Sequence, residues 1–282
     1  ARIARRTGLL FAVTHNYTGY PLVRQAREMV AGGELGALRV VQVEYAQDWL
    51  ATPLEQTGQK QAVWRTDPAQ SGPAGSLGDI GTHAYNLACF VTGLNCQELA
   101  AELSTFVPGR RLDDHVQIML RFAEGARGLL WASQVATGSR NNLRLRVFGE
   151  KGGMEWRQED PNGLWFAPLG KAPMLLHRAG PGATAVAAHA SRVPAGHPEG
   201  YLEAFAQLYT DIAEQISARL EKRPPAASSL LVPTVEDGVA GMQFISAVLG
   251  SSSRNAAWTA VAGRSLPLHP PPLPGTHYCL VN

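Results

Sequence analysis

Residues 72–93, with the sequence GPAGSLGDIGTHAYNLACFVTG, constrain the fold of this chain more than any other stretch. The segment begins as a glycine-rich loop and continues as a helix with an apolar face. Asp79 and His83 stand four positions apart, so on a helix both side chains lie on one face and can contact the same ligand. A carboxylate and an imidazole so placed can orient a substrate hydroxyl and move its proton near neutral pH. We therefore regard Asp79 and His83 as candidate catalytic residues.

A structural interpretation of the same residues stays open. Ser76 and Asp79 have the spacing of a capping box, in which Asp79 would only close the start of a helix. A single histidine in a helix is commonly a packed or a surface residue. Spacing alone does not decide between the two interpretations.

Composition disfavours several classes of partner. The chain has 282 residues, 45% of them hydrophobic, and a net charge of +2 without a dense Lys/Arg run, which argues against nucleic acid. No apolar run approaches the roughly 20 residues that span a bilayer, which argues against a membrane. The three cysteines, Cys89, Cys96 and Cys279, lack metal-ligand spacing. Their scarcity fits a reducing cytoplasm and unreactive thiols.

The N-terminal region resembles the end of an α/β unit. Residues 1–8 read as the last turns of a helix, and a domain rarely opens in mid-helix, so we expect the chain to be the C-terminal part of a longer protein. The apolar run 9–14 predicts a buried parallel strand. Asn16 and Tyr17 follow it, where α/β sheets bind ligands, although an ordinary strand-to-helix loop fits equally. Residues 21–31 have helical periodicity.

Most of the remaining sequence predicts strands. Residues 38–49 alternate apolar and polar side chains, as in an antiparallel sheet packed on one side. Many strands with short turns predict an α+β fold with a large, mostly antiparallel open sheet and flanking helices. The further strands are expected at 98–107, 115–122, 126–136, 142–148, 153–158, 164–168 and 174–177, and the helices at about 201–222 and 235–249.

Three other groups of residues could contact a ligand. Trp64 beside Arg65 could hold a sugar ring or a phosphate, or belong to a loop anchored by a buried tryptophan. His197 precedes a helix and could face a ligand or lie in a surface turn. Asp113 and His115 share one face of a strand, but two ligands do not make a metal site, so no metal is expected.

Together these motifs resemble the Gfo/Idh/MocA family of NAD(P)-dependent oxidoreductases over roughly residues 1–259. They are Asn16-Tyr17 with the helix after Pro21, the strand beginning at residue 38, the segment GSLGDIGTH at 75–83, and the helix pair after HPEGY at 197–201. The resemblance implies a Rossmann domain followed by a substrate domain built on a large sheet. It also implies hydride transfer between nicotinamide and a sugar, an inositol or a related polyol. In this family a lysine acts with residues matching Asp79 and His83, so His83 would be the general acid/base and Asp79 would orient it or the substrate.

The sequence departs from that family in ways that affect function. No G-x-G-x-x-G turn follows a strand, and the family's Glu-Lys-Pro motif is absent, so the cofactor-binding residues stay unknown and the chain is expected to be inactive alone. Leu87 stands where the family usually has an aspartate. We therefore expect a remnant of a dinucleotide-binding domain at 1–34, a substrate and oligomerisation domain at 35–260 and a disordered proline-rich tail at 261–282. The cofactor would be NAD or NADP.

Two alternative functions remain open from the sequence. The first is a non-catalytic binding or oligomerisation module, because a broad open sheet with apolar positions favours pairing with a second copy. The second is a metal-dependent hydrolase that uses Asp79, His83 and either His115 or His197. No spacing of three ligands supports this second alternative.

Overall fold

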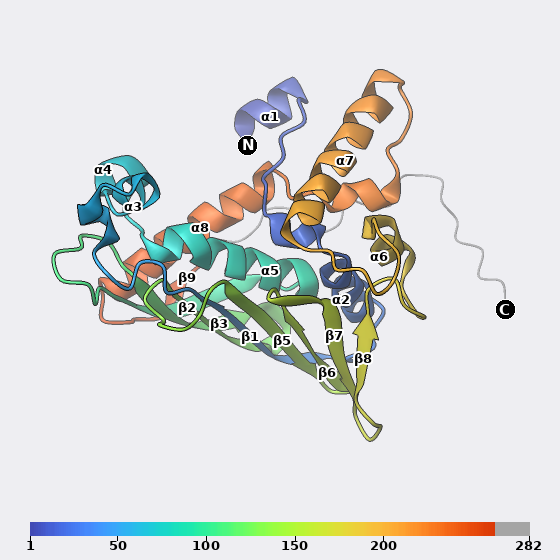
Figure 1. Cartoon of the computed structure of the whole chain (residues 1–282), viewed down its shortest axis with the longest axis horizontal. Helices are drawn as coiled ribbons and strands as arrows, with labels where there is room; N and C mark the ends of the chain where they lie inside the picture. Colours follow the sequence, from blue (N-terminus) through green and yellow to red (C-terminus); the bar gives the residue numbers. More distant parts are fainter. Residues whose placement is uncertain (263–282) are drawn as a thin grey trace.

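A computed structural model describes residues 1–262, so the expectations for residues 263–282 of the tail and for Cys279 lie outside the described residues. At its start the predicted disordered tail is wrong, because Val261 is buried and its N–H donates to the carbonyl oxygen of Gln97. Nine strands form one mixed sheet in the order β8-β7-β6-β5-β1-β4-β3-β2-β9. The helices gather over one face of this sheet, and the other face is left open (Figure 1). The strands are β1 Leu38–Ala46, β2 Cys96–Ser104, β3 His115–Phe122, β4 Arg127–Ser133, β5 Asn142–Gly149, β6 Gly152–Arg157, β7 Asp160–Pro168, β8 Met174–His177 and β9 Thr259–Ala260.

The centre of the sheet is the strand β1, which pairs antiparallel with β5 and parallel with β4. Every other strand pair in the described chain is antiparallel. The prediction of a large, mostly antiparallel sheet is therefore confirmed. Because β1 and β4 run parallel, their carboxyl ends meet at one edge of the sheet, and the residues that follow both strands come together there.

The helices share one hydrophobic core with the covered face of the sheet. Phe244 of α8 stacks on Tyr85 of α5, with ring centroids 4.0 Å apart, and both are buried. Core residues come from the N-terminal region as well as from the sheet, and the domain boundary at residue 34 stays a prediction. The helices are α1 Arg2–Thr7, α2 Pro21–Ala31, α3 Lys60–Arg65, α4 Pro68–Ser71, α5 Thr82–Thr92, α6 Ala185–Ala190, α7 Tyr201–Leu220 and α8 Val235–Ser252, with short turns η1 Asn16–Gly19, η2 Leu54–Thr57, η3 Leu77–Gly81, η4 Ala123–Gly125 and η5 Ala227–Leu231.

The apolar run 9–14 does not form the expected buried parallel strand. Within the described chain its ladder pairing is a single antiparallel bridge between Ala12 and Thr234. Leu9 and Phe11 are 67% and 53% exposed. A continuous apolar run is buried as a strand only where parallel neighbours and covering helices surround it, and the described residues supply neither at this position.

The start of the helix α5 depends on a carboxylate from another part of the chain. Asp113 accepts hydrogen bonds from Gly75 N (2.6 Å), Ser76 Oγ (2.8 Å) and Leu77 N (2.8 Å). A Cβ on Gly75 would lie 2.1 Å from the carbonyl oxygen of Asp113, so only glycine fits this close approach. The chain then forms the π-helical turn η3, which leads directly into α5.

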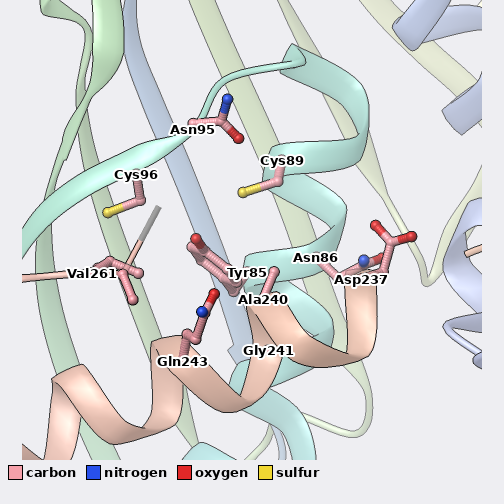
Figure 2. A pocket seen from close by; sticks show the side chains of 11 residues that line it. Tyr85, Asn86, Cys89, Asn95, Cys96, Asp237, Ala240, Gly241, Gln243 and Val261 are labelled. Atoms are coloured by element: carbon pink, nitrogen blue, oxygen red, sulfur yellow. The ribbon is translucent and has the colours of Figure 1, made fainter. Parts of the chain in front are cut away.

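A small cavity between α5, α8 and β2 is too small for a substrate. Its volume is about 20 Å³, enough for about one water molecule. Cys89 and Cys96 line it, together with Tyr85 and Gln243 (Figure 2). Neither thiol is in a disulfide, and burial raises the pKa of Cys96 to about 12. A thiol with that pKa stays protonated at neutral pH, in agreement with the expectation of an unreactive cysteine.

We predict that Asp113→Ala lowers the free energy of unfolding by about 3 kcal/mol, because three buried donors lose a charged acceptor. Chemical denaturation followed by circular dichroism measures this change. The matched control is Asp160→Ala, which removes an exposed aspartate of β7 and should leave stability nearly unchanged. Equal stability of the two variants would show that the Asp113 contacts do not hold the helix start.

Candidate functional site

A polar cavity of about 690 Å³ opens at the edge of the sheet where the parallel strands β1 and β4 end. It is far larger than the cavity beside the cysteines, and it contains the predicted pair Asp79 and His83. Amide, phenol and aromatic side chains form most of its wall. The lining residues are Thr14, Asn16, Tyr17, Tyr45, Gln47, Trp49, Gln59, Gln61, Arg65, Asp79, Ile80, His83, Arg140, Asn141, Tyr201 and Phe205.

The carboxylate of Asp79 is held by two donors from outside its own helix. Arg65 Nε donates to Oδ1 at 3.1 Å, and Gln134 Nε2 donates to Oδ2 at 2.7 Å. The capping-box interpretation is wrong, because the Ser76 side chain bonds to Asp113 and the Asp79 side chain makes no capping bond. Asp79 is thus a fixed, partly exposed anion on the cavity wall.

The imidazole of His83 is positioned by aromatic neighbours. Its Nδ1 lies 3.4 Å from Nδ1 of His15, and the ring of Tyr17 meets it edge-on at 5.4 Å. Burial lowers the pKa of His83, an effect that the charge of Asp79 opposes, so the ring is neutral at pH 7. Within residues 1–262 no hydrogen bond joins Asp79 to His83. Asp79 therefore does not orient the imidazole directly.

Neutral side chains form a hydrogen-bonded network among the residues that line the cavity. Tyr45 donates to Oδ1 of Asn141 (2.8 Å), and Gln47 Nε2 donates to the same oxygen (2.7 Å). Trp49 Nε1 donates to Gln47 (3.0 Å), and the hydroxyls of Tyr17 and Tyr45 are hydrogen-bonded to each other. Burial raises the pKa of both phenols, so they remain uncharged. Such a wall suits a ligand with several neutral hydroxyls.

Asn16 lines the cavity and carries an unsatisfied donor. Its side chain is 3% exposed, and its Nδ2 has no hydrogen-bond partner. A buried unpaired amide is costly, and a ligand oxygen would satisfy it. Of the residues predicted to bind substrate, the structure brings Asn16, Tyr17 and Arg65 into this cavity.

Trp64 and His197 do not line the cavity. Trp64 is 39% exposed, so it is not the buried anchor of its loop either, and the guanidinium of Arg65 stacks on its ring at 4.2 Å. His197 is exposed, and its carbonyl oxygen accepts a hydrogen bond from Arg178 (2.5 Å). Its neighbours at the start of α7, Tyr201 and Phe205, reach the cavity in its place.

Sequence reasoning missed several of the residues in and around the cavity. Gln47 and Gln134 directly follow β1 and β4, and Asn141 directly precedes β5. The signal that could have identified them is the parallel pairing of β1 with β4, which places the ends of the two strands side by side. Alternating hydrophobicity predicts that a strand exists but not which strand it pairs with.

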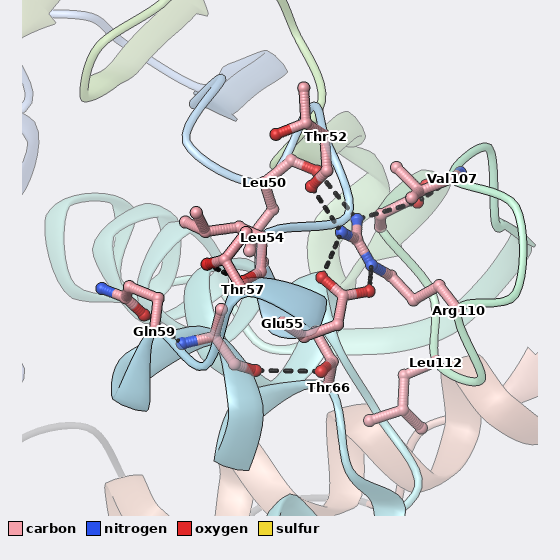
Figure 3. A network of polar contacts seen from close by, with 12 residues as sticks. Leu50, Thr52, Leu54, Glu55, Thr57, Gln59, Thr66, Val107, Arg110 and Leu112 are labelled. Carbon is pink, nitrogen blue, oxygen red and sulfur yellow. Dashed lines mark hydrogen bonds and ion pairs between the residues drawn. The ribbon is translucent and has the colours of Figure 1, made fainter.

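A buried arginine holds the segment that carries Gln59, Gln61 and Arg65. The guanidinium of Arg110 donates to the carbonyl oxygens of Leu50 (2.9 Å) and Thr52 (3.1 Å). It also bonds both carboxylate oxygens of Glu55, at 3.1 and 2.9 Å, as Figure 3 shows. Asp114 approaches the same guanidinium at 3.2 Å, so the buried charge is compensated.

The glycine-rich segment at 72–78 does not have the features of a pyrophosphate turn. The glycine-rich segment before η3 does not follow a strand, and its donors Gly75 N and Leu77 N are bonded to Asp113. Among residues 1–262 no three His, Cys, Asp or Glu side chains are placed to hold a metal ion. His115 lines a separate cavity with Trp131 and Phe106. None of the helices in the described chain is both long enough and apolar enough to cross a membrane.

Several proteins with a similar fold are named as oxidoreductases or dehydrogenases. The GFO/IDH/MocA C-terminal domain matches residues 23–155. An oxidoreductase from Sinorhizobium meliloti is 51% identical, with a TM-score of 0.78, over 88% of this chain and 64% of that one. An inositol dehydrogenase homolog from Azotobacter vinelandii, complexed with NAD+, is 33% identical, with a TM-score of 0.85, over 92% of this chain and 67% of that one.

A relative from Bacillus subtilis, the uncharacterized oxidoreductase YfiI, is 29% identical over 258 residues. That match covers 91% of this chain and 66% of the relative. The chain thus spans about two thirds of the length of the proteins it resembles.

We predict that the protein loses stability as the pH falls from 7 towards 5. Burial lowers the pKa of His15 to about 4 from an ordinary value of 6.5, so between these values the unfolded chain binds more protons than the folded one. The stabilisation is complete above pH 6.5 and is lost on acidification, by about 2 kcal/mol at pH 5. Urea denaturation at a series of pH values measures it.

His15→Asn should reduce this pH dependence, because asparagine does not titrate and only the part that comes from His83 remains. The control His177→Asn, at an exposed position of β8, should retain the dependence of the wild-type protein. The same slope in all three proteins would contradict the assignment to His15.

Proposed function

This chain belongs to the Gfo/Idh/MocA family, and we propose that it forms the substrate-binding part of a nicotinamide-dependent oxidoreductase that acts on a sugar, an inositol or a related polyol. The observation that carries the proposal is the cavity in which Asp79 and His83 face a wall of neutral hydrogen-bonding groups. A cyclic polyol presents hydroxyls around its rim and C–H groups on its faces. Amides and phenols match the hydroxyls, and Trp49, Tyr201 and Phe205 match the faces.

Asp79 and His83 have different roles in this proposal. Asp79 accepts a hydrogen bond from a substrate hydroxyl and fixes its direction, because Arg65 and Gln134 hold the carboxylate in place. The neutral ring of His83 exchanges the proton of the reacting hydroxyl. Asn16 Nδ2 supplies a donor to another hydroxyl oxygen. The nicotinamide would exchange a hydride with the carbon that carries the reacting hydroxyl.

The chain alone is not expected to turn over a substrate. The residues of 1–262 offer no amide-lined turn for the pyrophosphate, and the sequence lacks the Glu-Lys-Pro lysine. The proposed cofactor is NAD or NADP.

A second candidate function is supported by the open face of the sheet. Met119 and Leu129 are paired across β3 and β4, and Val40 and Phe148 across β1 and β5. All four are exposed on that face. Such a patch favours pairing with a second copy of the chain, as expected for a homo-oligomer or for a non-catalytic assembly module. Only the catalytic proposal gives a function to Asp79 and His83.

We predict that the purified chain binds myo-inositol or D-glucose and that Asp79→Asn and His83→Ala each weaken this binding about 10- to 100-fold, because each removes a hydrogen bond to the ligand. Isothermal titration calorimetry measures the affinity. The control His197→Ala removes an exposed histidine outside the cavity and should bind as the wild type does. If both cavity variants fold and still bind polyol normally, the assembly module becomes the better interpretation.

We further predict that NADH and NADPH show no saturable binding to the isolated chain, with or without polyol, because no pyrophosphate turn is present among the described residues. Fluorescence titration of the reduced cofactors measures this binding. A low-micromolar dissociation constant, or oxidation of NADH by the chain and a polyol, would show that a cofactor site exists in this chain after all.

A further inference from the structure

We propose that His15 is a positioning residue for His83: it engages Nδ1 of His83 and leaves Nε2 as the nitrogen that exchanges a proton with the substrate hydroxyl. The role of Nε2 toward a hydroxyl rests on the proposed function. The contact between the two imidazoles does not, and it can be tested without substrate.

The geometry of the two rings supports this assignment. The Nδ1 atoms of His15 and His83 are 3.4 Å apart, and the ring planes stand at 88° with centroids 5.2 Å apart. Tyr17 makes a second edge contact with His83, also at 88°. Two edge contacts restrict rotation of the His83 ring. Within the described residues Nε2 of His83 has no hydrogen-bond partner, so it is the nitrogen left for a ligand.

The two rings must divide their protons between them. A hydrogen bond between two Nδ1 atoms needs one donor and one acceptor, so the tautomers of two neutral rings are coupled. When His83 donates from Nδ1, its Nε2 carries no proton and can accept one from a hydroxyl. When His15 donates, Nε2 of His83 carries the proton and can give it to a carbonyl oxygen. The contact therefore leaves Nε2 of His83 as an acceptor in one tautomer and as a donor in the other.

Burial and nearby charges keep both rings neutral. His15 is 9% exposed and lies in a region that disfavours a cation. The acids that act on the pair are Asp79 in η3, toward His83, and Asp237 in α8, toward His15. Arg65 neutralises Asp79, and the phenol of Tyr17 is uncharged. With both rings neutral, the two Nδ1 atoms share one proton.

The backbone that carries His15 is fixed by buried contacts. Its carbonyl oxygen accepts hydrogen bonds from Thr18 N (3.1 Å) and Thr18 Oγ1 (2.9 Å). The carbonyl of Thr18 accepts from Nε of Arg24 (3.0 Å), whose guanidinium forms a buried ion pair with Asp211 of α7 at 2.7 Å. A Cβ on Gly19 would lie 2.2 Å from the carbonyl oxygen of Ala204, so the turn η1 packs tightly on α7. A rigid turn is what a positioning residue requires.

The experiment compares the full chain with two substitutions of His15, using protein labelled with ¹⁵N in its histidines. His15→Phe keeps an aromatic ring in the packing but cannot form the hydrogen bond. His15→Asn places an amide at the same number of bonds from Cα as Nδ1 and can restore it. Long-range ¹H–¹⁵N spectra at pH 7 without ligand report the tautomer of His83, whose signals are assigned from His83→Gln.

In the wild-type chain we expect Nδ1 of His83 to show the shift of a hydrogen-bonded nitrogen and to move on substitution of His15. In His15→Phe the shifts of Nδ1 and Nε2 should approach each other as the tautomers mix, and His15→Asn should restore their separation. Unchanged His83 shifts in a folded His15→Phe chain would overturn the proposal. So would a wild-type Nδ1 of His83 without the shift of a hydrogen-bonded nitrogen, a result that needs no variant to fold.

A second readout separates this proposal from the proposed function. The affinity for myo-inositol, measured from pH 5 to 8, should weaken in His15→Phe and recover in His15→Asn. If the wild-type chain binds no polyol but its His83 shifts respond to His15 as expected, the proposed function fails and the positioning role stands. If polyol binds and His83 does not respond to His15, the positioning role fails and the proposed function stands.

Discussion

The site depends on the hydrogen bonds that the carboxylate of Asp113 accepts. It accepts three hydrogen bonds from the chain at Gly75, Ser76 and Leu77, and it lies just before β3. These contacts fix where η3 begins, and η3 with α5 sets the direction of Asp79 and His83. The glycine at 75 permits the close approach, because any larger residue would meet the backbone of Asp113. The arrangement of the local motif at 75–83 thus depends on Asp113, which is distant in the sequence.

Buried arginines position the rest of the cavity. Arg24 pairs with Asp211 and supports the turn that carries His15 and Asn16, whereas Arg110 pairs with Glu55 and Asp114 and supports the segment that carries Arg65. A buried ion pair adds little net stability, because desolvation opposes the attraction. Its loss nevertheless leaves an unpaired charge, so each pair strongly favours one arrangement of the chain. The two arginines thus support two separate segments that contribute residues to one cavity.

Much of the fold could be predicted because its signals are local. The strand 115–122 and the helix 21–31 have the predicted bounds, since alternation and helical periodicity are properties of neighbouring residues. The expected strand at 9–14 failed for the opposite reason. Its apolar run has the composition of a buried strand, but burial depends on neighbours that the described chain does not place there.

The sequence by itself determined the classes of element and the spacing of the pair Asp79 and His83, because each depends on residues a few positions apart. The tertiary structure decided which groups act on that pair. His15 is 68 positions from His83, and Gln134 is 55 positions from Asp79. Their approach follows from the parallel pairing of β1 with β4 and from the packing of η1 on α7. Hydrophobic periodicity shows that a face is buried but leaves open which distant segment covers it, so only the folded chain reveals the environment that keeps His83 neutral.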